Sequence, residues 1–220
     1  RPRYDYSLSA RFFFESMDLL VGKETSLAKT KLIEILASIP YRAWENRQYA
    51  RMTRKYACWD IVKKAFSIML WSREAQDNEF THLLVIEEKM KEEGGKNAWY
   101  LYPVIPWMMA LGYTLMSFFF AFFNIRRAFL FNAEFEDHAE HVYAQFVKDH
   151  PEWENQPVKS DLVEEIYGKF DNWADVFRRI GLDERDHMNT SFDYAGMPEC
   201  IVRYEGMPPL RDSESAGEHM

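Results

Sequence analysis

Two histidines in this chain each follow a glutamate by three residues. Glu79 and His82 lie in NEFTH, and Glu184 and His187 lie in DERDH. On a helix, residues three apart project from the same face, about one turn from each other. A carboxylate and an imidazole directed at one point can bind a metal ion, although a single Glu-x-x-His pair also occurs on solvated helix faces.

Two further glutamates complete an ordered set. Glu34 lies among apolar residues in KLIEILASIP, and Glu136 lies in NAEFEDHAEHVY. Di-iron carboxylate proteins take one glutamate from each of two helices and a Glu-x-x-His pair from each of two others. The order of Glu34, the first pair, Glu136 and the second pair therefore predicts a centre for two iron ions inside a four-helix bundle.

Some of these glutamates have alternative roles or rival ligands nearby, and two neighbouring residues could orient the ligands. Glu34 could instead lie on the surface of an amphipathic helix. The stretch around Glu136 holds rival ligands, namely Glu134, His138, Glu140 and His141. Asn78 and Asp183 each come directly before a ligand glutamate, and we expect their polar side chains to orient the ligands.

The composition narrows the class of protein. The 220 residues suffice for one domain with a substantial core, and the net charge of −8 argues against a nucleic-acid partner. Cys58 and Cys200 are the only cysteines, which excludes a metal site built from cysteine. Aromatic residues make up 16% of the chain, and such a content favours contact with an apolar–aqueous boundary.

The elements that must position these ligands are helices. Helical periodicity covers residues 26–50, 59–93 and 128–149, and residues 161–192 form one helix or two short ones. Pro40 is expected to kink the first helix, and GGKN at 94–97 is expected to end the second. Residues 150–160 are expected to form a polar loop.

These elements predict an all-α protein with a ferritin-like four-helix bundle over residues 26–192. Residues 1–25 are expected to form an N-terminal arm and an interfacial helix, and residues 193–220 an extended C-terminal tail. The basic and polar start, RPRYDYSLSA, is typical of the mature end left after removal of a transit peptide.

Residues 103–123 contain no charged side chain and are long enough to span a bilayer. If they crossed it, Glu34, Glu79 and His82 would lie on one side and the other three ligands on the opposite side. A shared metal centre therefore requires that this run lies in the membrane interface or is buried against a partner. The alternative is a true span in a protein without the metal centre. We expect the following side chains to face the membrane: Phe12, Phe13, Phe14, Trp107, Phe118 and Phe119, with Arg126 and Arg127 at the headgroups.

Four segments resemble, in order, the ligand motifs of the alternative oxidase family, and most closely those of its plastid terminal oxidase branch. These segments are LIEILASIPYRAW, NEFTHLLVIEE, EDHAEHVYAQF and FRRIGLDERDH. The resemblance covers residues 26–192. It implies that two iron ions are held by Glu34, Glu79, His82, Glu136, Glu184 and His187.

The resemblance also bears on the quinol site. In the family, a tyrosine near that site follows the third-motif glutamate by seven residues, and Tyr143 stands at this place; an ordinary core tyrosine is the alternative. Better-known members carry an arginine and a histidine that help to bind quinol. Lys29 and Phe129 stand near those two positions.

The family resemblance implies a membrane-bound quinol oxidase that reduces dioxygen to water without pumping protons. Its partners would be plastoquinol or ubiquinol, dioxygen and the lipid of one leaflet, and it would commonly form a homodimer. Closeness to the plastid branch favours the thylakoid over the mitochondrial inner membrane. The alternatives are a di-iron hydroxylase, which needs an organic substrate and a reductase, and a subunit of a larger membrane complex with little or no turnover.

Overall fold

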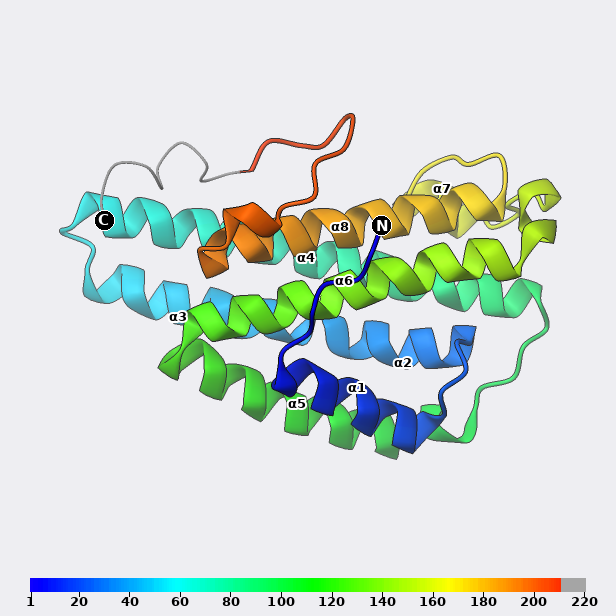
Figure 1. Cartoon of the computed structure of the whole chain (residues 1–220), viewed down its shortest axis with the longest axis horizontal. Helices are drawn as coiled ribbons and strands as arrows, with labels where there is room; N and C mark the ends of the chain where they lie inside the picture. The colour runs from blue at the N-terminus through cyan, green and yellow to red at the C-terminus, as the bar shows by residue number, and fades with distance from the viewer. Residues whose placement is uncertain (211–220) are drawn as a thin grey trace.

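The computed structural model describes residues 1–210, and within them the chain is all-helical, with no strand (Figure 1). The all-α prediction is thereby confirmed. The α-helices are α1 (Leu8–Val21), α2 (Leu27–Ala37), α3 (Ile39–Arg54), α4 (Trp59–Glu92), α5 (Val104–Phe123), α6 (Ile125–Asp149), α7 (Asp161–Ile166) and α8 (Trp173–Ala195). Short 3-10 turns cover Trp99–Leu101, Pro151–Asn155 and Pro198–Cys200.

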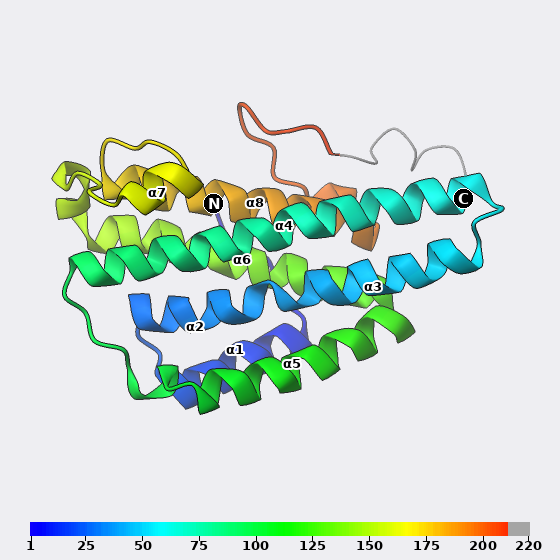
Figure 2. The ribbon, with the colours of Figure 1, turned by 180° about the vertical axis from the view of Figure 1, so that it is seen from behind.

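Four rods form the body of the molecule. Helices α2 and α3 follow each other end to end as one rod, and α4, α6 and α8 are the other three (Figures 1 and 2). Helix α6 packs along α8, and α4 packs along both α2 and α3. Helices α1 and α5 lie outside this bundle on the same side of the molecule, where α5 contacts α2, α3 and α6.

The predicted helix over residues 26–50 is two helices. The first ends at Ala37, and Pro40 lies in the first turn of the second, where its missing N–H group breaks no helical hydrogen bond. The interruption therefore comes just before Pro40 rather than as a kink within one helix. The side chain of Ser26 accepts a hydrogen bond from the backbone of Lys29, which fixes the start of α2 and the register of Glu34.

Helix α4 ends where the glycine signal predicts. The backbone of Gly94 has φ 63°, a left-handed conformation that favours glycine. Residues 161–192 divide into the short α7 and the long α8, and the side chain of Asn172 caps the start of α8 by accepting from the backbone of Asp175.

The prediction for residues 150–160 needs correction, and the prediction for the tail is met in its described part. Residues 150–160 are more than a polar loop, because Trp153 is buried and its ring packs on Phe146 and Phe177. The tail after Gly196 is largely extended, as expected, but its described part is tied to α8, since Asn189 exchanges two hydrogen bonds with the backbone of Val202. Residues 211–220 of the predicted tail lie outside the described residues.

Helix α5 is apolar and long enough to cross a membrane, and it is the one helix of the described chain with this property. Trp107 and Phe119 expose 64% and 57% of their surface, and Phe12 on α1 exposes 74%. All three therefore point outward, as a membrane-facing role requires.

Three other aromatic side chains were expected to face the membrane, but in the structure they do not face outward. Phe13 packs against Tyr113, Phe131 and Phe135, and Phe14 stacks on His138, so both rings of α1 turn toward the bundle. The helical period separates them from Phe12, because neighbouring residues on a helix cannot share one face. Phe118 is half-buried against the aromatic cluster on α3 and α4.

Candidate metal centre

Six side chains meet in the middle of the bundle, one or two from each rod. They are Glu34 from α2, Glu79 and His82 from α4, Glu136 from α6, and Glu184 and His187 from α8. All six are buried. The structure thus brings together every residue that the spacing and the resemblance select as a ligand.

The ligand atoms form two overlapping groups. One group contains Glu34, Glu79, His82 and Glu184, and the atoms of each group lie within 4.8 Å of one another. In the second group, Glu136 and His187 replace Glu34 and His82, while Glu79 and Glu184 take part again. Two carboxylates shared between two four-residue groups are the arrangement by which a protein bridges a pair of metal ions.

The two Glu-x-x-His pairs approach each other crosswise. Nδ1 of His187 lies 2.9 Å from Oε1 of Glu79, and Nδ1 of His82 lies 3.0 Å from Oε1 of Glu184. Each imidazole is therefore closer to the shared carboxylate of the facing helix than to its own partner three residues earlier, at 3.8 and 3.7 Å. The pairs on α4 and α8 are thus related by approximate twofold symmetry.

Eight buried polar atoms at this centre have no hydrogen-bond partner within residues 1–210. They are Oε2 of Glu34, both carboxylate oxygens of Glu79, Nδ1 of His82, Oε2 of Glu136, both carboxylate oxygens of Glu184 and Nδ1 of His187. Unpartnered polar atoms are rare in folded proteins, and buried charges need compensation. Four carboxylates and two neutral imidazoles are balanced in charge by two divalent cations, so the residues fit a pair of metal ions.

In the metal-free centre the pKa values of Glu34, His82 and His187 also indicate that the buried carboxylates need compensating positive charge. Burial, reinforced by Glu79 and Glu184, raises the pKa of Glu34 well above its usual value. Burial opposes ionisation of His82 and His187, but contacts with carboxylates outweigh it and raise both imidazole pKa values well above normal. Without metal, protons on these groups thus supply the compensation that cations supply when bound.

The two unshared glutamates are each held by a tyrosine. Tyr143 donates a hydrogen bond to Oε1 of Glu34. Tyr41 donates one to Oε1 of Glu136 at 2.8 Å, and Asn132 donates a second to the same oxygen at 2.9 Å. In both glutamates the other oxygen remains unpartnered and turned to the centre. These contacts fix the carboxylates and leave one oxygen of each for a metal ion.

Asp183 and Asn78, which were expected to orient the ligands, differ in their positions. Oδ2 of Asp183 lies 3.4 Å from Nε2 of His82 and accepts a hydrogen bond from Tyr167 at 2.5 Å. Asp183 therefore reaches a ligand on the facing helix, not the glutamate beside it. Asn78 is half-buried at the edge of the centre and makes no hydrogen bond to a ligand within the described residues, so its expected role is not met.

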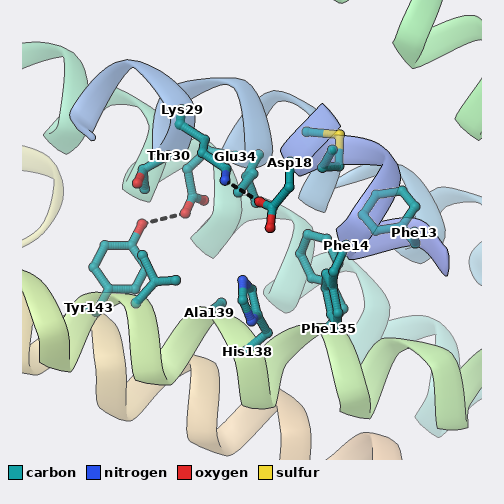
Figure 3. A pocket seen from close by; sticks show the side chains of 13 residues that line it. Phe13, Phe14, Asp18, Lys29, Thr30, Glu34, Phe135, His138, Ala139 and Tyr143 are labelled. Atoms are coloured by element: carbon teal, nitrogen blue, oxygen red, sulfur yellow. Dashed lines mark hydrogen bonds and ion pairs between the residues drawn. The ribbon is translucent and has the colours of Figure 1, made fainter. Parts of the chain in front are cut away.

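An apolar pocket reaches the centre at Glu34 and Tyr143 (Figure 3). It lies between α1, α2 and α6, with a volume of about 50 Å³, which is room for a few water molecules. Its lining includes Phe13, Phe14, Met17, Ile33, Phe135 and Val142. The polar lining residues are Asp18, Lys29, Thr30, Glu34, His138 and Tyr143, and Lys29 is paired with Asp18 at 2.6 Å.

His138 is a further polar group of this pocket. Its ring stacks on Phe14 with centroids 4.3 Å apart, and its buried Nδ1 has no hydrogen-bond partner. Burial, helped by the cations Arg3 and Lys29, lowers the pKa of His138 to about 4, so the imidazole is neutral at pH 7. Phe129 lies elsewhere, packed on Trp44, and does not line the pocket.

No protein-family model matches the chain, and no curated protein is similar to it.

The remaining candidates around Glu136 have other partners. Glu134 accepts hydrogen bonds from Ser7, and Glu140 is paired with Arg1 and Arg185. His141 bonds to the backbone of Asp137. The geometry thereby selects Glu136, the one glutamate of the stretch that faces the centre.

The sequence alone does not identify three residues that hold the carboxylates at the centre by hydrogen bonds, namely Tyr41, Asn132 and Tyr167. Asn132 precedes Glu136 by four residues and so shares its helix face, a signal that could have been used. Tyr41 and Tyr167 reach the centre from other elements, and no local spacing connects them with their partners.

Proposed function

We propose that the chain is a membrane-bound di-iron quinol oxidase that reduces dioxygen to water. The observation that carries the proposal is the pair of overlapping ligand groups that share Glu79 and Glu184. Oxygen and imidazole ligands without cysteine suit iron or manganese, and two such ions in a carboxylate bundle are typical of dioxygen chemistry. The order of the motifs and their resemblance to the alternative oxidases favour iron and a quinol.

The pocket at Glu34 supports a substrate that is an apolar ring with hydroxyl groups. Its walls are mostly aromatic and aliphatic, and Nδ1 of His138 is free to bond a hydroxyl group. Tyr143 stands between the pocket and the centre through its hydrogen bond to Glu34. Because the free volume is small, a quinol ring requires the side chains of α1 to move aside.

The chemistry of the bound metal pair would be the transfer of electrons from quinol to dioxygen. Two quinols supply the four electrons and four protons that convert one dioxygen to two waters. Burial and the neighbouring Glu34 raise the pKa of Tyr143 well above its usual value, so its hydroxyl keeps its proton and donates it to the Glu34 hydrogen bond. Tyr143 thereby orients the carboxylate that faces the substrate pocket.

The position of α5 supports attachment to one membrane face. Helix α5 lies along the bundle rather than projecting from it (Figures 1 and 2). A true span would pull the charged bundle into the bilayer, whereas the outward Trp107, Phe119 and Phe12 can enter one leaflet. By resemblance, we propose the plastid thylakoid with plastoquinol, the mitochondrial inner membrane with ubiquinol being the alternative, and a homodimer.

The test is oxygen uptake by the full chain purified in mild detergent. We expect two iron ions per chain, matching the two ligand groups, and uptake on addition of a short-chain quinol, with two quinols consumed per dioxygen. Glu184→Ala should abolish uptake, and the exposed Glu165→Gln should not change it. Uptake that needs an organic substrate and a reductase would replace the proposal with a hydroxylase; two irons without uptake would favour a complex subunit.

A further inference from the structure

Helix α8 and the tail that follows it lie on the side of the bundle opposite to α1 and α5 (Figure 1). A second opening is lined by residues of α4, α8 and this tail. Its volume is about 530 Å³, far more than that of the apolar pocket. One face of α4 and one face of α8 contribute to it, with Glu74, Asn78, Asp183, Asp186, His187 and Thr190 among the lining residues.

This opening reaches the metal centre through His187. The ring is 7% exposed, and its Nδ1 is enclosed and faces the shared carboxylates. No hydrogen bond joins the opposite nitrogen, Nε2, to another group within residues 1–210, and His187 is a lining residue of the opening. Metal-bound histidines usually place this second nitrogen against a protein group or water.

The His82 half of the centre is separated from this opening by Asp183. Nε2 of His82 faces Asp183, which is itself held by Tyr167 and Arg179. The ring of Tyr167 packs on His82 with centroids 5.8 Å apart. The two ligand groups therefore differ in access, because the ligand His187 itself lines the opening, whereas Glu34 of the His82 group borders the small apolar pocket.

The charge of the lining suits a hydrated cation. Carboxylates of Glu74, Asp183 and Asp186 line the opening. Asp183 is ion-paired with Arg179, and Asp186 accepts a hydrogen bond from the uncharged Tyr204. None of the lining residues within residues 1–210 is a lysine or an arginine. Acidic clefts attract divalent cations and accelerate their arrival. In the apolar pocket the aromatic and aliphatic walls and the small volume of about 50 Å³ disfavour a hydrated cation.

The tail forms the outer wall of this opening. Tyr204 donates a hydrogen bond to Asp186 at 2.7 Å, and Asn189 holds the backbone of Val202. Pro208 and Pro209 follow as lining residues. The described part of the tail thus borders the opening on its outer side.

We propose that this opening is the route by which divalent metal ions reach the centre from water, and that they arrive at the His187 half. The inference rests on the proposed metal centre but not on quinol oxidation. The inference assigns one route to the metal ions and another to the apolar substrate. Metal ions pass between α4 and α8, and the substrate passes beside α1.

The experiment follows Co²⁺ binding to metal-free full chain in detergent by stopped-flow absorbance. The double variant Glu74→Gln/Asp186→Asn keeps the side-chain shapes and removes two charges, and Glu164→Gln/Glu165→Gln removes two exposed charges from α7 as the matched control. We expect loading about tenfold slower in the first variant alone, with a weaker salt dependence and an unchanged final content of two Co²⁺.

A steric variant tests the same route without a change of charge. Thr190→Phe should fill the opening and slow loading, whereas Val142→Phe, in the apolar pocket, should not. Equal loading rates in the Glu74→Gln/Asp186→Asn variant, its control and Thr190→Phe would overturn the proposed route while leaving the metal centre intact. Failure of the folded wild-type chain to bind Co²⁺ would overturn both, and failure of quinol oxidation alone would leave this inference standing.

Discussion

The hydroxyl of Tyr143 donates a hydrogen bond to Glu34, and both side chains line the apolar pocket. On the other side of the centre, Tyr41 donates to Glu136 but borders no part of that pocket. The two tyrosines thus hold equivalent carboxylates in unequal surroundings. We therefore expect Tyr41 to support the metal ions alone, and Tyr143 to affect the substrate as well.

Removal of each hydroxyl tests that distinction. Tyr143→Phe should keep both metal ions and lower kcat/KM for quinol about tenfold or more, because it frees the carboxylate that faces the substrate. Tyr41→Phe is the matched variant and should affect kcat/KM less, since Asn132 still bonds Glu136. Steady-state oxygen uptake and metal content measure both. Equal losses in the two variants would show that the pocket is not the substrate site.

The shared and unshared glutamates should differ in their effect on metal content. Glu79 belongs to both ligand groups, so Glu79→Ala should weaken both metal positions. Glu34 belongs to one group only, and Glu34→Ala should leave one ion bound beside Glu136 and His187. Equilibrium dialysis with Co²⁺ gives the stoichiometry. Retention of two ions by Glu79→Ala would be incompatible with a bridging role.

The metal-free protein should lose stability as the pH rises. The pKa values of Glu34, Glu136, His82 and His187 lie above their ordinary values of 4.5 and 6.5. Each group binds its proton more tightly when folded, so its stabilisation is complete below those ordinary values and is lost as the pH rises through the folded pKa. Glu79, with a pKa lowered to about 2, acts in the opposite sense, but its effect is complete above about pH 5.

Thermal unfolding between pH 6 and pH 9 measures this effect. After treatment with a chelator, the melting temperature should fall by about 5 °C or more across this range. The metal-loaded protein should not follow, because metal ions require deprotonated ligands and bind more tightly at high pH. A metal-free protein whose stability rises with pH would contradict the assignment of these groups as buried and uncompensated.

Membrane attachment should depend on the outward side chains of α5. Trp107→Ser/Phe119→Ser removes two exposed aromatic rings and should weaken binding to liposomes about tenfold or more. Trp59 is similarly exposed, at 71%, but lies on α4, so Trp59→Ser is the matched control and should bind as the wild type does. Liposome flotation measures the difference. Equal losses would show that α5 is not the contact surface.

Much of the ligand set can be read from the sequence because helical geometry is local. Three-residue spacing places Glu79 beside His82 and Glu184 beside His187 whatever the rest of the chain does. The class of fold follows from the same periodicity. Glu34 and Glu136 carry no such local partner, and their selection depended on the ordered pattern rather than on spacing alone.

The parts that the sequence did not predict depend on contacts between distant segments. Tyr41 lies 95 residues from Glu136, and no periodicity reports such a contact. The aromatic run Phe12, Phe13, Phe14 was assigned to one surface, although neighbouring helical residues must diverge. The opening beside His187 depends on where the tail folds back on α8, which the extended appearance of that segment does not specify.

Two metal ions that share Glu79 and Glu184 should be visible by diffraction from crystals of the iron-loaded chain, recorded at the iron absorption edge. We expect two anomalous peaks in each chain, one between Glu34 and His82 and one between Glu136 and His187, with both shared carboxylates in contact with both ions. A single peak, or two peaks that do not share those carboxylates, would contradict this arrangement.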